Sequence, residues 1–399
     1  MGKLILMWNK TPPGNNEKSP ENIADNFHIE QLQLICSGNR KKLSLSGYIK
    51  NLNEFSFVDR LEHLQWTTLF HNRLNFEYVP SESITARLEF RNRLYYGDAV
   101  KNILGFSRII SRDAGWADLS WNLIDDKNAV LNSTMDMALI NYSKGKWDIT
   151  LGRQRVNWGM NLVWNPNDIF NTYNFLDFDY EERPGSDALR VQYYLCDFSK
   201  IEVSAKKGRS MDDYIIAGMY KFNTSSYDIQ LITGVYQKDW MFGAGWAGNL
   251  KDAGFKGEIS YFVPMESYLK SAKVLSASIS ADYAFKKGLY VNSSLLYNSN
   301  AYNFAENLGS LLYTDLNAKN LIPFKYSGFL QFSKEFSPIV SGSVGFIYSP
   351  TNHSVIFLPS LNYSVARNWD LNFTGQSFFE FEEYKTLGNI FFIRLRWSF

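Results

Sequence analysis

The chain has 399 residues, of which 45% are hydrophobic and 20% are charged, and its formal net charge is +1. This balance excludes an intrinsically disordered chain, and it excludes a nucleic-acid-binding protein that relies on strong positive charge. Aromatic residues make up 16% of the chain, yet no apolar run reaches the roughly 18 residues of a transmembrane helix. Two classes are left: a soluble all-β protein and a transmembrane β-barrel. The strands of such a barrel alternate apolar and polar residues, so an average hydropathy does not detect them.

Residues 1–42 predict a polar, poorly ordered N-terminal segment in the periplasm. Its short apolar stretch at 4–7 is followed at once by Asn9, Lys10, Pro12 and Pro13. This stretch is shorter than the core of a signal peptide, and no small-residue cleavage site follows it. We therefore expect the export signal to be absent from the given chain.

The first clear hairpin lies in residues 68–96. Leu74, Phe76 and Tyr78 alternate with polar residues, a turn follows at Pro80, and the next strand alternates apolar residues with charges. An arginine that faced lipid at the bilayer midplane would cost about 2–4 kcal/mol, so we predict that these charges face a wet interior. The charged residues of the second strand are Arg87, Glu89, Arg91 and Arg93.

The same alternation continues to the C-terminus and predicts an antiparallel barrel of about 18 strands within residues 43–399. Short connections alternate with long ones, the longest at 97–129 and 158–186, which is typical of short periplasmic turns and long extracellular loops. The predicted strands are residues 43–58, 63–79, 83–96, 130–143, 147–157, 187–195, 200–207, 212–222, 226–237, 240–249, 253–263, 274–285, 288–298, 323–333, 338–348, 354–363, 368–381 and 388–399.

The connection at 158–186 belongs to a segment, residues 152–190, whose composition is not explained by the requirements of a β-barrel wall. Its tryptophans, other aromatics and balanced charges argue against disorder, and a loop of this length is usually functional. We expect it to fold inward and narrow the lumen. The residues of this signature loop are Trp158, Gly159, Trp164, Asn165, Pro166, Pro184 and Gly185.

The order of residues in this block, GRQ-x-V-x-WG, then NP-x-D, then RPG, resembles a group of outer-membrane barrels related to porins and to alginate-export-type exopolysaccharide channels. The resemblance implies an 18-strand barrel and leaves the substrate open. The aromatic and Asn-rich style, with the phrase at 43–48, resembles outer-membrane proteins of the Bacteroidetes type. The matching positions are Arg153, Gln154, Trp158, Gly159, Asn165, Pro166, Asp168, Arg183, Pro184 and Gly185.

The last strand alternates large apolar residues with Arg394 and Arg396 and ends on Trp397, Ser398 and Phe399. A soluble edge strand is the alternative, but an apolar edge left open invites aggregation. The strand resembles the terminal strand of bacterial outer-membrane barrels, which implies that Trp397 and Phe399 are the signal for the barrel assembly machinery. We therefore expect the outer membrane of a Gram-negative bacterium, with lipid and lipopolysaccharide around the barrel.

No enzymatic motif, metal site or cofactor site is predicted. The four histidines lack metal-ligand spacing, and neither a Gly-x-Ser-x-Gly motif nor a phosphate-binding loop is present. A barrel phospholipase is the one enzyme alternative, without a nameable nucleophile. Carboxylates at 177–182 could bind Ca²⁺, but we expect them to pair with Arg183, Arg190 and other arginines. Cys36 and Cys196 either form a disulfide in the periplasm or stay as two thiols.

Three functions fit these features. The first is a porin-like channel for small polar or anionic solutes or saccharides, because rings of arginine favour anions. The second is a barrel that exports capsule or exopolysaccharide, or binds surface polysaccharide through Tyr173, Phe175, Tyr302, Phe304 and Tyr313. The third is a subunit of an oligomer or of a larger outer-membrane complex. For the channel, the predicted solute pathway consists of Arg87, Glu89, Arg91, Arg93, Arg153, Arg155, Asp168, Arg183, Asp187, Arg190, Arg394 and Arg396.

Overall fold

The structure is a computed structural model that describes residues 42–58, 63–172, 175–176, 185–210, 213–265, 272–301, 316–382 and 385–399. The predicted N-terminal segment, apart from its last residue, lies outside these ranges. So do Arg183 and Pro184 of the predicted site, the carboxylates at 177–182, Cys36, and the aromatics Tyr173, Tyr302, Phe304 and Tyr313.

The described residues form nineteen strands and two short helices. Their bounds are β1 Leu43–Phe57, β2 Gln65–Ser81, β3 Ile84–Gly97, α2 Asp98–Asn102, α3 Phe106–Ile110, β4 Ser120–Asp125, β5 Ala129–Lys144, β6 Trp147–Gln154, β7 Ser186–Cys196, β8 Ser199–Lys207, β9 Tyr214–Thr224, β10 Tyr227–Tyr236, β11 Asp239–Leu250, β12 Ala253–Pro264, β13 Val274–Ala284, β14 Leu289–Asn298, β15 Tyr326–Ser337, β16 Val340–Ser349, β17 Ser354–Ala366, β18 Trp369–Glu380 and β19 Lys385–Ser398.

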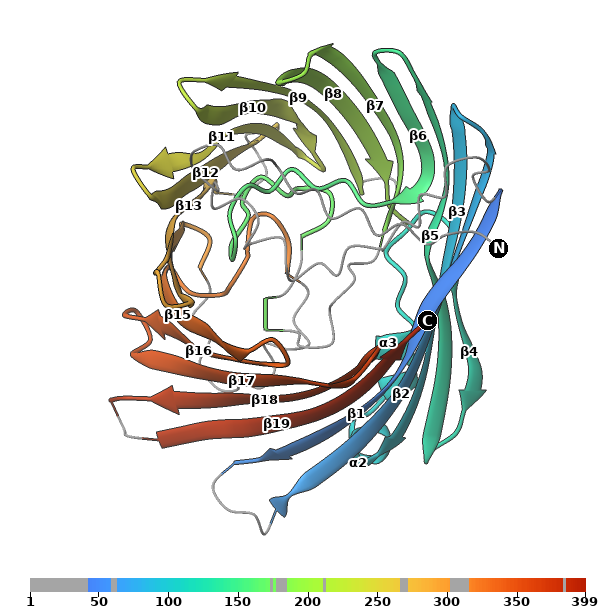
Figure 1. The fold of residues 1–399 in the computed structure, drawn as a ribbon, viewed down its shortest axis with the longest axis vertical. Helices are drawn as coiled ribbons and strands as arrows, with labels where there is room; N and C mark the ends of the chain where they lie inside the picture. The colour runs from blue at the N-terminus through green and yellow to red at the C-terminus, as the bar shows by residue number, and fades with distance from the viewer. Residues whose placement is uncertain are drawn as a thin grey trace, which may run out of the picture. The chain divides into compact units, whose positions relative to one another are not determined.

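The strands close into a barrel, seen end-on in Figure 1. β1 pairs with β2 on one side and with β19 on the other, where Ile49 lies opposite Trp397. β3 pairs directly with β5, and β4 is an additional strand that pairs along part of β5. With β4 set aside, eighteen antiparallel strands form the wall, which confirms the predicted barrel and its strand number.

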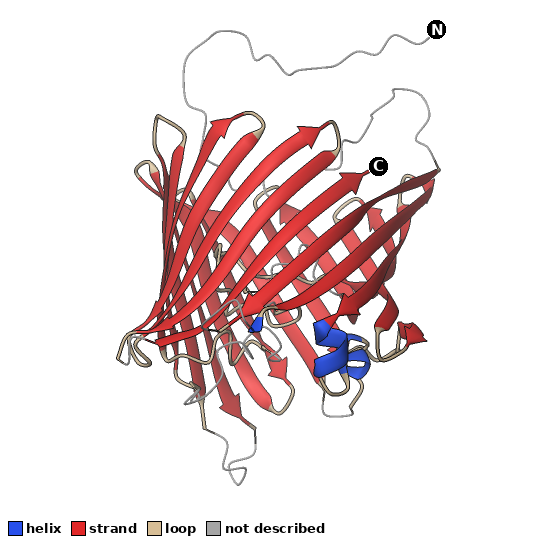
Figure 2. Cartoon of the chain, turned by 90° about the horizontal axis from the view of Figure 1, so that it is seen from below, coloured by secondary structure: helices blue, strands red, loops and turns tan. Residues whose placement is uncertain are grey.

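The two ends of the barrel differ as the sequence predicts. Short turns join β2 to β3, β5 to β6 and every second pair after them, whereas the long connections lie at the other end, as Figure 2 shows from the side. The C-terminus lies at the short-turn end. There Phe399 and Gly47 exchange two backbone hydrogen bonds of 2.9 and 3.0 Å, which pair the last residue with β1.

The outward faces of the strands are mainly apolar, whereas the inward faces carry polar side chains together with buried apolar ones such as Phe329 and Ile356. Leu151, Ile216 and Phe242 are 50–62% exposed on the outer surface, whereas Glu202 and Ser260 are completely buried on the inner face. A soluble barrel of this kind would bury its apolar face instead. The outward apolar belt and the polar interior are typical of barrels that lie in lipid. Neither described helix is long and apolar enough to cross a membrane.

The predicted long connection at 97–129 contains α2, α3 and β4, none of which is among the predicted elements. Gly97 has a φ of +116°, a backbone conformation that favours glycine, and the chain turns from β3 into α2 at this point. Phe106 of α3 then packs against Tyr95 and Val130. Each helix has only five residues, too few to show a helical period in the sequence, and such short helices depend on packing.

Candidate functional site

The connection between β6 and β7 folds into the barrel interior, where Figure 1 shows it as a green trace inside the ring of strands. Its described part begins at Arg155 and continues to Thr172, with Phe175, Leu176 and Gly185 beyond. We call residues 155–172 the inner loop. Most of its side chains are buried, and Val156 and Ile169 pack against inward-facing residues of β9 to β13.

Glu258 of β12 holds the middle of the inner loop. One of its carboxylate oxygens accepts hydrogen bonds from the backbone N–H groups of Met160 and Asn161, the latter at 2.7 Å. The other oxygen accepts the N–H of Asn167 at 2.9 Å. Ser260, two residues further along β12, donates to the carbonyl of Pro166 at 2.9 Å. Three N–H groups that converge on one buried carboxylate form charge-assisted hydrogen bonds, so the loop is fixed to this wall.

Glu202 of β8 holds the start of the inner loop. Its carboxylate accepts hydrogen bonds from the Trp158 indole N–H at 2.7 Å and from Arg190 Nε at 2.8 Å. Gln192 Nε2 donates to the same carboxylate at 2.7 Å, and Gln230 Nε2 donates to the Trp158 carbonyl at 2.7 Å. The indole N–H and the backbone carbonyl of Trp158 are therefore both bound to the wall. Arg190, a predicted pathway residue, is tied to this anchor.

Two glycines of the signature allow close contacts. A Cβ atom at Gly159 would lie 2.5 Å from the Asn165 side-chain oxygen, and one at Gly185 would lie 2.5 Å from the Asp136 carbonyl. The Gly185 N–H donates to that carbonyl at 3.0 Å. A side chain at either position would overlap with its neighbour. These contacts give a structural reason for both glycines and for Asn165.

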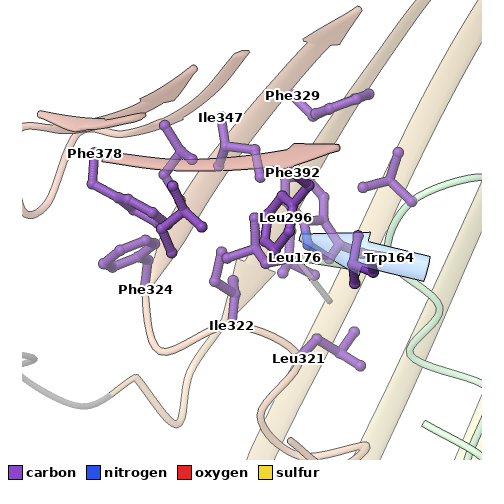
Figure 3. Packing of buried hydrophobic residues seen from close by; sticks show 14 of the residues in the cluster. Trp164, Leu176, Leu296, Leu321, Ile322, Phe324, Phe329, Ile347, Phe378 and Phe392 are labelled. Atoms are coloured by element: carbon purple, nitrogen blue, oxygen red, sulfur yellow. The ribbon is translucent and has the colours of Figure 1, made fainter. Parts of the chain in front are cut away.

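The β6–β7 connection also contributes residues to an apolar cluster inside the barrel (Figure 3). Trp164 lies edge-on to Phe329 of β15 with ring centres 6.4 Å apart, and Phe175 contacts the same ring at 5.2 Å. Gln376 Nε2 of β18 donates to the Leu176 carbonyl at 2.7 Å. The buried members of this inner apolar cluster are Leu52, Leu69, Val163, Trp164, Leu176, Leu296, Leu321, Ile322, Phe324, Phe329, Ile347, Ile356, Phe378, Ile390 and Phe392.

A second connection, residues 316–325 before β15, meets the inner loop in this cluster. Leu321, Ile322 and Phe324 are buried there. The cavity between Leu321 and Trp164 measures only about 10 Å³, which is room for about one water molecule. The two connections are therefore packed against each other across part of the interior.

A different wall of the interior carries basic side chains. In the pairing of β1 with β19, Lys50 lies opposite Arg396, and in the pairing of β2 with β3, Arg73 lies opposite Arg91. The acidic residues on the same inward faces are Glu54, Glu77 and Glu89. We call the following residues the basic wall: Lys50, Arg73, Arg87, Arg91, Arg93, Arg394 and Arg396.

Ion pairs join neighbouring strands within this wall. Asp136 of β5 contacts Arg73 at 2.6 Å and Arg91 at 3.0 Å, and all three side chains are buried or nearly so. Glu89 also pairs with Arg73. Arg87 pairs with Glu77 at 2.6 Å and keeps 43% of its side chain exposed. The wall therefore has a buried, paired centre and a hydrated basic edge.

Arg153 and Asp187 lie elsewhere. Arg153 Nε contacts Asp187 at 2.8 Å, Arg153 Nη1 contacts Asp113 at 2.6 Å, and Arg153 Nη2 donates to the Ala117 carbonyl at 2.7 Å. Arg153 follows the outward-facing Leu151 by two positions, so it shares the outward parity of β6. The β3–β5 connection covers this side of the strand ends. The pair holds that connection in place and does not face the interior.

The remaining predicted residues take varied positions. Asp168 is buried within the inner loop, and Arg155 is half-buried at its start. Cys196 is exposed at the end of β7, so its pairing with Cys36 stays a prediction. Among the described residues, no group of three or more His, Cys, Asp or Glu side chains could hold a metal ion.

Sequence reasoning missed Glu202, Glu258 and Asp136. Each occupies an inward position of a strand, so strand parity signals that the side chain faces the interior. Parity does not say which distant segment it meets. Glu258 lies more than 90 residues from its partners in the inner loop.

Comparisons with known proteins agree with this architecture. The chain matches no family model and no curated protein sequence. It is similar to the crystal structure of Acinetobacter baumannii OccAB4, with a TM-score of 0.58, 10% identity, and coverage of 91% of this chain and 100% of that chain. It is also similar to Pseudomonas aeruginosa OccK11 (OpdR), with a TM-score of 0.56, 10% identity, and coverage of 89% and 95%.

A third similar structure is the outer membrane protein opdK from Pseudomonas aeruginosa, with a TM-score of 0.55, 9% identity, and coverage of 89% and 98%. At these identities the likeness shows the fold, so the chain has the closed, 18-stranded antiparallel barrel of these solved proteins. The relation to alginate-export-type channels and the Bacteroidetes origin stay predictions.

Proposed function

We propose that the chain is an outer-membrane channel for small polar or anionic solutes, narrowed by the inner loop. The observation that carries this proposal is the β6–β7 connection inside the closed barrel, where Glu258 of one wall binds the inner loop and Gln376 of another wall binds the Leu176 carbonyl beyond that loop. A barrel whose only task was to anchor a surface loop would not need an ordered segment fixed across its interior. A loop bound at several points narrows a pathway and sets its shape.

The outer surface supports the membrane location. Large apolar side chains such as Leu151, Leu231 and Phe242 are exposed on the outward faces of the strands, where a lipid bilayer would cover them. Trp397 and Phe399 share this outward face at the end of β19, with ring centres 5.3 Å apart. That position suits recognition by the barrel assembly machinery. Lipid and lipopolysaccharide would surround the belt.

The basic wall supports a preference for anions. Its basic residues outnumber the acidic residues on the same faces of β19, β1, β2 and β3, and Arg87 at its edge is hydrated. Basic side chains along a pathway raise the local concentration of anions and repel cations. A small organic or inorganic anion is therefore the solute class that this interior suits best.

The polysaccharide alternative depends on exposed aromatic side chains in long loops. Of the five aromatics proposed for it, Phe175 is the one within the described residues, and it packs inside the barrel against Phe329. Phe175 thus serves the inner apolar cluster. This position inside the barrel does not support a sugar-binding platform at Phe175.

A reversal-potential measurement tests the proposal. The refolded, heat-modifiable protein is placed in a planar bilayer with a KCl gradient. We expect a chloride-to-potassium permeability ratio above one, because the basic wall favours the anion. A ratio below one would contradict the anion preference. A silent membrane that contains demonstrably folded protein would contradict the channel.

A further inference from the structure

The outer face of β1, β2, β3 and β5 carries side-chain amides. At the corresponding positions of other strands, the outer face carries apolar side chains that suit contact with lipid. Asn51 and Asn53 follow the outward-facing Ile49 at alternate positions of β1. Asn72 follows the outward-facing Phe70 in the same way on β2. The register places Asn72 opposite Asn92 of β3, and Asn92 opposite Ser133 of β5. We call Asn51, Asn53, Thr68, Asn72, Asn92 and Ser133 the amide patch.

Hydrogen bonds connect the amide patch across the strands. Ser133 Oγ donates to Asn92 Oδ1 at 2.7 Å, and Asn92 Nδ2 donates to Asn72 Oδ1 at 3.2 Å. Asn53 Nδ2 donates to Asn51 Oδ1 at 2.7 Å. An asparagine amide carries two N–H donors and a carbonyl with two lone pairs. The Trp66 indole N–H and the Thr68 hydroxyl also donate to Asn53 Oδ1, and Asn72 Nδ2 donates to the Tyr48 carbonyl at 3.4 Å. These bonds occupy both lone pairs of Asn53 Oδ1 but only part of the donor capacity of the amides, so the patch keeps N–H donors that face outward.

A hollow adjoins the patch toward the long-loop end of the barrel. Its volume is about 440 Å³. The short side chains of Thr68 and Ala129 lie there between larger neighbours, which leaves a recess in the outer wall. The residues that line the hollow are Asn51, Asn53, Trp66, Thr68, Phe70, Leu94, Tyr96 and Ala129.

Hydrocarbon is a poor environment for this surface. Lipid tails offer no partner to an amide N–H, so amides that face them stay partly unsatisfied. The far side of the barrel shows the alternative, because Ile216, Leu231 and Phe242 occupy outward positions of β9, β10 and β11. The patch therefore favours contact with protein.

We propose that the amide patch and its hollow bind a second copy of this chain within the membrane. A two-fold interface uses the same surface on both partners, so that surface must be complementary to itself. Asparagine amides meet this condition, because each one both donates and accepts hydrogen bonds. None of the residues that line the patch or the hollow is charged. Beside the hollow, Lys101 lies 5.8 Å from the centre of the Tyr96 ring and Asp98 accepts the Trp66 N–H, so the two neighbouring charges have opposite signs and do not form a cationic site. This inference rests on the membrane location in the proposed function.

The test is the number of chains per particle, measured by native mass spectrometry of the full chain in lipid nanodiscs. The variant N72L/N92L keeps similar side-chain size and removes the amides, while T233V changes a single outward-facing polar residue on β10 as a matched control. We expect two copies for the wild type and for T233V. For N72L/N92L we expect dimer dissociation to increase about tenfold or more, since hydrogen bonds between membrane segments contribute roughly 1–2 kcal/mol each.

Other outcomes would overturn the inference. These are a single copy for the wild type, an unchanged dimer in N72L/N92L, or a lipid or a different protein bound at the patch. Heat-modifiability and an unchanged conductance per barrel show that the variant still folds. A conducting monomer would end the dimer inference and leave the channel intact, whereas a folded protein that is silent would end the channel proposal alone.

Discussion

Two walls of the same interior use inward polar side chains differently. On β8 and β12, Glu202 and Glu258 accept hydrogen bonds from the inner loop. On β2, β3 and β5, Arg73, Arg91 and Asp136 form ion pairs between neighbouring strands. Both walls arise in the same way, from polar residues at the inward positions of a strand. The two glutamates of the first wall fix a loop, and the charges of the basic wall join neighbouring strands.

Breaking the centre of the basic wall should have the largest effect. Asp136→Ala removes a buried carboxylate that pairs with both Arg73 and Arg91, and loss of one partner from a buried ion pair typically costs about 3–5 kcal/mol. We expect the free energy of unfolding in detergent micelles to fall by that amount, measured by urea titration. Glu77→Gln, at the half-exposed pair with Arg87, is the control and should cost less than about 1 kcal/mol. Equal costs for the two variants would contradict the distinction between centre and edge.

Removing Glu258 from the first wall should loosen the inner loop while the barrel stays closed. Glu258→Ala leaves three buried backbone N–H groups without their acceptor, at about 1–3 kcal/mol for each group that stays unsatisfied. Partial relaxation of the loop should keep the total near 2–3 kcal/mol. We expect faster proteolysis within residues 155–172 and larger current fluctuations in single-channel recordings. A quiet channel with a protected loop would show that Glu258 does not anchor it.

A smaller change tests the start of the loop. Trp158→Phe removes the indole N–H that binds Glu202 and keeps most of the ring packed against Phe170. A hydrogen bond to a charged group contributes about 1.5–3 kcal/mol. We expect a loss at the lower end of that range in a urea titration, because Arg190 and Gln192 still bind Glu202. Trp164→Phe, whose indole has no hydrogen bond to another described residue, is the matched control and should lose less.

The smallest expected effect tests the contribution of the basic wall to ion selectivity. Arg87→Gln removes a hydrated charge that contributes on the order of 0.5–1 kcal/mol to the energy of a nearby ion. The chloride-to-potassium permeability ratio should therefore fall about two- to fivefold, with little change in stability. A ratio that stays constant would place Arg87 outside the ion pathway.

Much of the barrel follows from alternation in the sequence. Strand positions, their number and the two kinds of connection are predicted because each strand has its own two-residue period, as at Leu74, Phe76 and Tyr78. The inner face of the basic wall follows from the same parity. These features need no knowledge of which strands approach each other across the barrel.

The anchoring of the inner loop does not follow from alternation. Glu258 and Asn167 are joined only by the folded chain, and no local pattern marks their contact. Arg153 shows a second way in which sequence reasoning is incomplete. Its charge predicts that the side chain faces the interior of the barrel. The β3–β5 connection provides Asp113 and the Ala117 carbonyl, and these let the arginine be buried on the outward side.

The most direct test of the proposed function is the single-channel conductance of the wild type against a variant that lacks residues 160–182. Both proteins are compared in the same bilayer after folding is verified by heat-modifiability. If the inner loop narrows a channel, the variant should show stepwise conductance several times that of the wild type. Equal conductance would show that the loop does not limit flow. Silence of both folded proteins would show that the barrel is no channel.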